Sequence, residues 1–339
     1  MINRKDFFAS RERGKPAPPV TASYNEELEL MWGKKWGAQS EVGKLRSVLV
    51  HRFGDEYGKA ALSEDPVWYA ITQVPDLEKA REQFDNLISI LGKEGIQIYY
   101  LDPPSPAHGP YSPVNPRIWG TRDPGVVIEG GAIISRMSNP WRKGDEVFWA
   151  KKAMEIGCPI IYTVNGSGTF EGGNVVWLDS EHVCIGRSIR TNTEGLRQVS
   201  QIMMGVGQVK EVRIVDLPGY LENIEWPAGG FPHLDCVFGM VDLDLALVYP
   251  PALPYEFLRY LECDKKIKLI EVSPEDQRRV ACNIIALEPR RIIINSGCEE
   301  VAKKLEKNKV DVIQVGVGEF NKTGGGPHCA VGPLIRDKI

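Results

Sequence analysis

The segment at residues 284–317 reads IIALEPRRIIINSGCEEVAKKLEKNKVDVIQVGV. Its short apolar runs at 284–287 and 291–295 predict two strands joined by a turn. A helix is expected at 299–308 and a third strand at 310–317. The apolar runs are nearly continuous, as expected for strands that are covered on both faces. The segment therefore predicts one ββαβ unit of an α/β fold.

Four further units of this kind lie upstream. Their predicted elements occupy residues 45–53, 77–91 and 96–101; 125–135, 145–156 and 159–164; 173–178, 183–186, 193–204 and 209–217; and 234–241, 245–249, 255–261 and 267–272. The units recur about every 40–60 residues, a spacing typical of circular or solenoid arrays. Five units that close on themselves form a ring whose short loops converge on a central channel. An open α/β sheet with the same element order is the alternative that periodicity leaves open.

Residues outside this repeat are charged and aromatic. We interpret residues 1–40 as an N-terminal extension that serves as an ordered arm, a lid or an oligomer contact. Residues 41–339 contain no clear boundary, and we expect them to form a single domain. The Pro-rich stretch at 103–116 predicts a surface loop near the channel mouth.

Composition argues against several classes of function. The chain has 339 residues, a net charge of −4 and no basic block, so we expect no nucleic-acid partner. No apolar run reaches membrane-spanning length and the first residues lack the apolar core of a signal peptide, so we expect no membrane partner and a cytoplasmic location. The seven cysteines are scattered without a CxxC pair. We therefore expect no metal, no disulfide framework and no cofactor.

A glycine-rich loop near the C-terminus presents one thiol. It reads GGGPHC at residues 324–329. Because the loop has almost no side-chain bulk, a ligand can approach its backbone closely. Cys329 is therefore a candidate nucleophile, and an ordinary buried cysteine after a loop is the alternative.

The histidines leave one candidate for a general acid or base. His233 lies in GGFPHLD at 229–235, at the predicted start of a strand, where Asp235 would share its face because strand side chains alternate. A histidine beside an aspartate can transfer protons, although two polar residues facing water are the alternative. His328 adjoins Cys329, and neighbouring side chains rarely face each other. We interpret the other three histidines as structural: His51, His108 and His182.

Two further carboxylates lie at predicted strand starts. The segment GSGTFEGGN at 166–174 is not a dinucleotide loop, because its third glycine is one residue late and a strand follows it instead of a helix. We interpret its glycines as placing Glu171 at the head of a strand. Asp123 has the same setting in WGTRDPG at 119–125.

These residues together suit attack by a thiolate on a planar cationic carbon. Asp123 and Asp235 would bind the cation by charge-assisted hydrogen bonds. Cys329 would attack, and His233 would give a proton to the departing amine. Glu171 would orient His233, as the third member of a triad does.

The same pieces resemble those of the guanidino-group-modifying superfamily, which contains arginine deiminases, dimethylarginine dimethylaminohydrolases and arginine amidinotransferases. They run in family order: EVGKL at 41–45, VLVH at 48–51, RD at 122–123, FEGG at 170–173, IGRSIRTN at 185–192, HLD at 233–235 and GGGPHC at 324–329. The resemblance implies the pentein fold, a five-bladed pseudo-symmetric ββαβ propeller, in agreement with the repeat.

The resemblance also implies residue roles. It makes Cys329 the nucleophile, His233 the acid/base, Glu171 its partner and Asp123 the residue that holds the guanidinium. Family members that bind an α-amino acid place two arginines on its carboxylate, and by position these are Arg142 and Arg190. An arginine can bind a carboxylate with two parallel hydrogen bonds.

Some residues separate the branches of the superfamily. Asp235 favours an unmethylated guanidinium, because methyl groups there would leave its carboxylate buried and unpaired. The residues after Cys329 resemble deiminases, but the chain has no room for their inserted helical domain, and His328 is common in transferases. Asn174 replaces the aspartate that usually closes the Glu-Gly-Gly motif.

We therefore expect a cysteine-dependent amidino hydrolase, similar to arginine deiminase, that acts on L-arginine or a close analogue through an S-amidino-cysteine intermediate. An arginine amidinotransferase and a dimethylarginine dimethylaminohydrolase-like hydrolase are the alternatives within the enzyme class. A ring-shaped binding protein without catalysis is the alternative outside it. The expected partner is a small guanidino compound, and formation of a homo-oligomer is left open.

Overall fold

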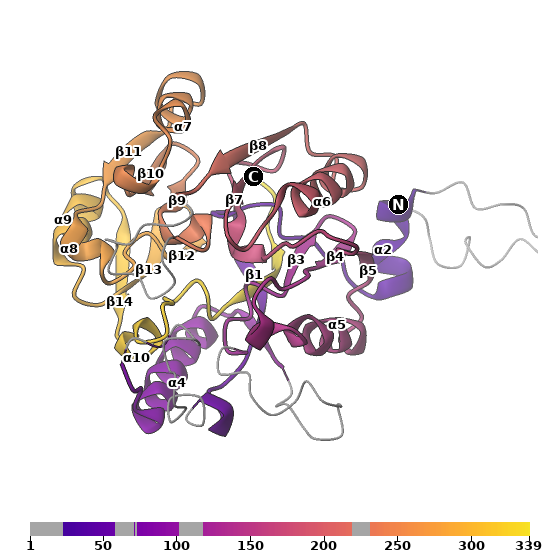
Figure 1. Cartoon of the computed structure of the whole chain (residues 1–339), viewed down its shortest axis with the longest axis horizontal. Helices are drawn as coiled ribbons and strands as arrows, with labels where there is room; N and C mark the ends of the chain where they lie inside the picture. The colour runs from indigo at the N-terminus through magenta and orange to yellow at the C-terminus, as the bar shows by residue number, and fades with distance from the viewer. Residues whose placement is uncertain (1–22, 58–70, 72, 102–117, 219–230) are drawn as a thin grey trace, which may run out of the picture.

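The computed structural model of the chain describes residues 23–57, 71, 73–101, 118–218 and 231–339. Within these residues, five three-stranded sheets surround a common centre, with helices on the outside of the ring (Figure 1). This arrangement confirms the predicted five-bladed ββαβ propeller. The Pro-rich loop at 103–116, with His108, lies outside the described residues, as do residues 1–22 of the predicted extension.

All five blades have the same topology. The middle strand pairs antiparallel with one neighbour and parallel with the other. A helix makes each parallel connection, because parallel strands cannot be joined by a tight turn. The blades, each with its helix, are β15–β1–β2 with α4 (Gly332–Arg336, Leu45–Val50, Gln97–Tyr100; Leu77–Lys93), β3–β4–β5 with α5 (Gly125–Ile128, Gly131–Ile134, Ile160–Thr163; Asp145–Glu155), β6–β7–β8 with α6 (Val175–Trp177, His182–Arg187, Glu211–Asp216; Thr193–Gly205), β9–β10–β11 with α7 (Phe238–Asp242, Leu245–Val248, Lys268–Glu271; Tyr255–Arg259) and β12–β13–β14 with α9 (Ile285–Glu288, Arg291–Asn295, Asp311–Val315; Glu299–Lys307).

The first blade is assembled from distant parts of the chain. Its sequence unit contains only two strands, and the C-terminal strand β15 supplies the third by pairing antiparallel with β1. Gly37 extends this contact, because its N–H donates to the Leu334 carbonyl and its carbonyl accepts from the Arg336 N–H. The helix α2 (Tyr24–Trp32) precedes this contact. The ring therefore closes through β15.

Two predicted strands begin later than expected. Short 3₁₀ turns, η4 (Gly172–Asn174) and η5 (Leu234–Cys236), replace the starts of the strands predicted at 173–178 and 234–241. The backbone groups of these turns bond to other blades instead of a neighbouring strand. The Gly172 N–H donates to the Asp123 carbonyl over 2.8 Å. His233 and Asp235 thus do not lie on one strand face, and that expectation was wrong.

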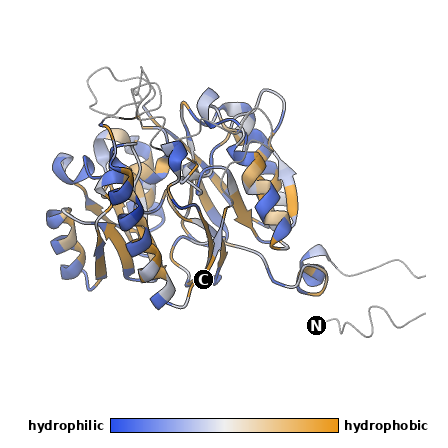
Figure 2. Ribbon diagram, turned by 90° about the horizontal axis from the view of Figure 1, so that it is seen from below, coloured by the Kyte–Doolittle hydropathy of each residue, from blue (hydrophilic) through white to orange (hydrophobic). Residues whose placement is uncertain are grey.

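Apolar side chains fill the space between the sheets and the helices. The helix α4 shows the pattern: Asp76 caps it by accepting from the Lys79 N–H, and its buried face consists of Ala80, Phe84, Leu87 and Leu91. Figure 2 shows the hydrophobic colour mainly on the strands and the hydrophilic colour on the helices. No helix among the described residues is long and apolar enough to cross a membrane.

The closing strand gives a test of the fold. Leu334 is fully buried on β15, so Leu334→Ala should lower the free energy of unfolding by about 2–5 kcal/mol. Ile339→Ala, at a side chain that is 40% exposed, is the control and should change it by about 0.5 kcal/mol or less. Chemical denaturation measures both. Equal effects of the two substitutions would contradict the closure of the ring by β15.

Candidate active site

Three of the predicted site residues, from different blades, meet in one buried cluster. Asp123 precedes β3, Glu171 precedes β6 and His233 precedes β9. Their side chains are at most 5% exposed. His233 Nε2 lies 2.8 Å from Glu171 Oε2, and His233 Nδ1 lies 3.5 Å from Asp123 Oδ1. The cluster therefore contains one imidazole between two carboxylates.

The double glycine after Glu171 makes this approach possible. A Cβ atom at Gly173 would lie 2.7 Å from Asp123 Oδ1 and 2.8 Å from the His233 ring. A Cβ atom at Gly172 would lie 2.3 Å from the Arg122 carbonyl oxygen. Larger residues would push the carboxylate and the imidazole apart, so the glycines are required by packing.

Asn174 joins the loop of Glu171 to the loop of His233. Its Oδ1 accepts from the Leu234 N–H over 3.1 Å, while its Nδ2 donates to Thr191 Oγ1 over 3.0 Å and to the Pro232 carbonyl over 3.3 Å. An ionised aspartate could only accept hydrogen bonds. The asparagine thus supports both loops in this chain.

Charge pairing sets the protonation of the cluster. Burial alone would raise the pKa of Glu171, but its hydrogen bond with His233 and the Arg190 charge lower it well below its usual value. Burial alone would lower the pKa of His233, but Asp123 and Glu171 raise it above its usual value. The charges of His233 and Arg142 likewise keep the pKa of buried Asp123 low. The imidazolium with two carboxylates is the favoured state.

Arg142 is tied to carboxylates of the protein itself. Its Nη1 donates to Asp123 Oδ2, its Nε to Asp145 Oδ2 over 2.9 Å and its Nη2 to the Gly120 carbonyl over 3.0 Å. Burial raises the pKa of Asp145 to about 7 despite this partner. With every nitrogen engaged, Arg142 holds Asp123 in place, and the structure does not present it to a substrate carboxylate.

Arg190, the second predicted carboxylate ligand, also lies at the cluster. It is 4% exposed, and its guanidinium carbon lies 5.8 Å from the centre of the Trp141 ring. Its charge is one cause of the low pKa of Glu171.

Asp235 is paired with His328. His328 Nδ1 lies 2.8 Å from Asp235 Oδ2, and the Cys236 thiol lies 3.6 Å from Asp235 Oδ1. On its other side, His328 Nε2 lies 3.4 Å from Glu41 Oε2. A cationic substrate at Asp235 would thus meet a carboxylate that already has a partner.

Cys329 is buried beside the segment that carries Asp123. The Arg122 N–H donates to the Cys329 carbonyl over 3.2 Å, and the Cys329 N–H donates to Asn283 Oδ1 over 3.3 Å. A Cβ atom at Gly325 would lie 2.3 Å from the Trp119 ring. At least one glycine of this loop is therefore required by packing against the protein, where the sequence suggested room for a ligand.

Sequence reasoning missed two residues of this region. In the sequence, Glu41 is one residue of the EVGKL motif at 41–45 with no sign of its own role, and His328 adjoins Cys329, a position from which the two side chains are not expected to face each other. Consecutive residues in a loop can point in different directions, and the His328 side chain points to Asp235. The other described histidines have local partners: His51 Nε2 lies 3.2 Å from Glu56 Oε1, and His182 Nδ1 lies 2.8 Å from Asp179.

Among the described residues, two sets of side chains have the composition of a metal site. His233 with Asp235 and Cys236, and Asp123 with Glu171 and His233, each place three potential ligand atoms within 4.8 Å of one another. These groups already have partners, and the carboxylates are balanced by neighbouring cations. We assign no metal ligand here.

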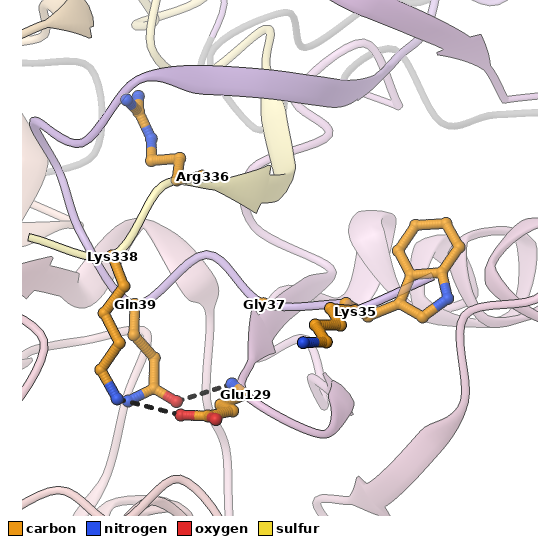
Figure 3. A pocket seen from close by; sticks show the side chains of 7 residues that line it. Lys35, Gly37, Gln39, Glu129, Arg336 and Lys338 are labelled. Carbon is orange, nitrogen blue, oxygen red and sulfur yellow. Dashed lines mark hydrogen bonds and ion pairs between the residues drawn. The ribbon is translucent and has the colours of Figure 1, made fainter. Parts of the chain in front are cut away.

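A pocket of about 150 Å³ lies elsewhere (Figure 3). It contains none of the predicted site residues, and its lining consists of Lys35, Trp36, Gly37, Gln39, Glu129, Arg336 and Lys338. Within it, Lys338 pairs with Glu129 over 3.1 Å and Gln39 accepts from the Glu129 N–H. Lys338 and Glu129 thus neutralise one another, and we assign the pocket no function.

Comparison with known sequences finds enzymes alongside an uncharacterized protein. YkgA of Bacillus subtilis, which is uncharacterized, is 28% identical over 298 residues, 88% of this chain and 94% of that protein. A 2-nitroimidazole nitrohydrolase of a Mycobacterium species is 24% identical and covers 92% of this chain and 84% of its own. An arginine deiminase of Bacillus cytotoxicus is 22% identical over 98% of this chain and 87% of its own.

Solved structures share the fold. A serine variant of dimethylarginine dimethylaminohydrolase from Pseudomonas aeruginosa, complexed with citrulline, has a TM-score of 0.66 at 22% identity and covers 86% of this chain and 99% of its own. The amidinotransferase SxtG from Microseira wollei, of the saxitoxin biosynthetic pathway, has a TM-score of 0.70 at 15% identity and covers 90% of this chain and 98% of its own.

A family model places the chain more narrowly. The model of the eukaryotic N,N-dimethylarginine dimethylhydrolases matches residues 70–336, which is well over half of the chain. This range contains the buried Asp123–Glu171–His233 cluster, the Asp235–His328 pair and Cys329. The chain belongs to the N,N-dimethylarginine dimethylhydrolase family, within the guanidino-group-modifying pentein superfamily.

Proposed function

We propose that this protein is a cysteine-dependent amidino hydrolase that acts on the guanidinium carbon of L-arginine or a close guanidino analogue. The observation that carries the proposal is the buried 2.8 Å contact between His233 and Glu171 beside Asp123. The backbone carbonyl of Cys329 accepts a hydrogen bond from the N–H of Arg122, the residue before Asp123. These contacts support a site with a thiol, a paired imidazole and a carboxylate.

The first half of the reaction forms a covalent intermediate. Asp123 accepts hydrogen bonds from the guanidinium, and the Cys329 thiolate adds to its carbon. The C–N bond to the leaving amine breaks as His233 transfers its proton to that nitrogen. Glu171 keeps His233 oriented and protonated. Ammonia leaves, and the rest of the substrate remains attached to Cys329 as a substituted S-amidino-cysteine. We assign Arg190 to the α-carboxylate of the substrate.

Water completes the cycle. His233, now neutral, takes a proton from a water molecule that adds to the amidino carbon. The carbon–sulfur bond breaks, the thiolate returns and a ureido product leaves. For the arginine cation the sum is arginine plus water giving citrulline plus ammonium, because the proton that the ureido group loses ends on ammonia, so atoms and charge balance without a metal or a redox cofactor.

Two alternatives use the same nucleophile. The fold shared with an amidinotransferase supports transfer, in which the alkyl amine of the substrate leaves, the amidino group stays on Cys329 and an acceptor amine then replaces water. The family to which the chain belongs supports a methylated arginine as substrate, with a methylamine as leaving group. Asp235 favours the unmethylated substrate, because a guanidinium that replaces His328 there must supply the N–H donor that His328 gave, and a methyl group supplies none.

A product assay separates these readings. The protein is incubated with arginine, methylated arginines, other guanidino compounds and 2-nitroimidazole, each with and without an acceptor amine, and products are analysed by mass. A ureido product without added amine supports the hydrolase, and turnover that needs the amine supports the transferase. No product from any of them would overturn the proposal.

Replacement of the nucleophile should separate binding from turnover. Cys329→Ser should abolish product formation while calorimetry still detects the substrate. The matched control is Cys263→Ser, which removes an exposed thiol and should retain full activity. Normal turnover by Cys329→Ser would contradict the assignment of the nucleophile.

The pH dependence should report His233. Its imidazolium form is the proton donor, so kcat/KM should fall as the pH rises through its raised pKa. Glu171→Gln removes one of the negative charges that raise this pKa, and the alkaline fall should move to lower pH. The loss of orientation should also reduce kcat by about 10²–10⁴-fold. A profile that keeps its alkaline limb in this variant, with native unfolding behaviour, would contradict the pairing.

A further inference from the structure

His328 lies between two buried carboxylates from separate parts of the chain. Its Nδ1 lies 2.8 Å from Asp235 Oδ2 and its Nε2 lies 3.4 Å from Glu41 Oε2. All three residues are at most 6% exposed. A neutral imidazole has one N–H, whereas two carboxylates that face both ring nitrogens require two. The geometry therefore favours the imidazolium form.

Glu41 is fixed by further contacts around its other oxygen. Its Oε1 accepts from Arg122 Nη2 over 3.0 Å and from the Trp177 N–H over 3.4 Å. The same Arg122 nitrogen donates to the Val175 carbonyl over 2.7 Å. Glu41 thus connects the residue before Asp123 with the strand β6 that follows Glu171.

Several charges act on His328 from these elements. Burial and the Arg122 charge lower its pKa, but Asp235 and Glu41 outweigh them and raise it above the usual value. Burial would raise the pKa of Glu41, but Arg122 and His328 lower it to about 2. Arg336 faces Glu41 on one side, and the Cys236 thiol contacts Asp235 on the other. Two carboxylates therefore hold one imidazolium.

We propose that Glu41 and His328 are positioning residues that hold Asp235 in an ion pair in the free protein, and that a substrate guanidinium competes with His328 for Asp235. The first part stands on the contacts around His328. The competition rests on the proposed function, because it requires a cation at Asp235. The pair then sets the preference of the site between cationic and neutral substrates.

The competition has a definite sign with pH. At low pH, the imidazolium neutralises Asp235 and repels a second cation. When a guanidinium takes Asp235, His328 loses one carboxylate and gains a cationic neighbour, so its pKa falls and a proton passes to solvent. Affinity for the guanidinium therefore rises as the pH increases through the pKa of His328 in the free protein.

The ion pair is tested by NMR of the histidine ring nitrogens in the free wild-type protein. Only five histidines are present, and His328→Asn assigns the signal. We expect both ring nitrogens of His328 to stay protonated through neutral pH. Glu41→Gln should lower the titration midpoint by about one pH unit or more, because a nearby opposite charge is lost.

A matched control shows whether the lower His328 midpoint requires the loss of Glu41 or follows from the loss of any buried carboxylate. Glu319 is also 6% exposed and binds the Asp76 N–H and Lys322. Glu319→Gln should leave the His328 midpoint unchanged. A neutral His328 at pH 7 in the wild-type protein, or equal midpoints in wild-type and Glu41→Gln proteins, would overturn the ion pair.

The competition is tested by calorimetry of arginine binding to Cys329→Ser in buffers of different ionisation enthalpy. We expect up to one proton released per arginine near the His328 midpoint, and none when His328→Asn is added, since asparagine keeps a donor near the Nδ1 position but cannot titrate. Binding without proton release in Cys329→Ser would overturn the competition. Failure of every guanidino compound to bind would refute the proposed function and the competition, while the NMR titration still decides the ion pair.

Discussion

Buried charge is the constraint on which this site depends. A charged side chain removed from water is costly unless a partner of opposite charge lies within hydrogen-bond distance. At the cluster these partners come from different blades: His233 pairs with Glu171, and His328 with Asp235. Each partner is carried by a separate loop, so the pairs form only when the blades that carry them are packed together. His328 and Cys329 lie in the loop before β15, so the strand that closes the ring also positions these two residues.

The pairing determines which side chains are available to a ligand. Asp123 is held by Arg142, but its Oδ1 accepts no hydrogen bond from the described residues and faces His233. One carboxylate oxygen of Asp123 is therefore available to a ligand beside the imidazole. Asp235 is occupied by His328 until a ligand replaces that partner. A substrate with several N–H groups on one planar cation satisfies both positions. The binding of a guanidinium at both carboxylates depends on the proposed function, and the available acceptor on Asp123 gives a physical reason for that function.

The sequence predicted the architecture better than the site. Apolar runs of strand length repeat five times, so the blades could be located, but the first blade borrows β15 through long-range pairing that no local pattern records. The residues of turns η4 and η5 were expected to lie in strands. The turns could not be predicted from the sequence, because their hydrogen-bond partners lie on other blades. Glu41 and His328 gave no distinct signal for the same reason, because their importance arises from partners far away in the chain.

The central claim is that the Cys329 sulfur becomes bonded to the amidino carbon of the substrate. The most direct measurement is rapid acid quenching of a single turnover with isotope-labelled arginine, followed by peptide mass spectrometry. The account predicts a transient adduct on the peptide that contains Cys329, with the mass of arginine less one ammonia, formed before the ureido product appears. Product formation with no label on that peptide at any time, or a label on another cysteine, would contradict it.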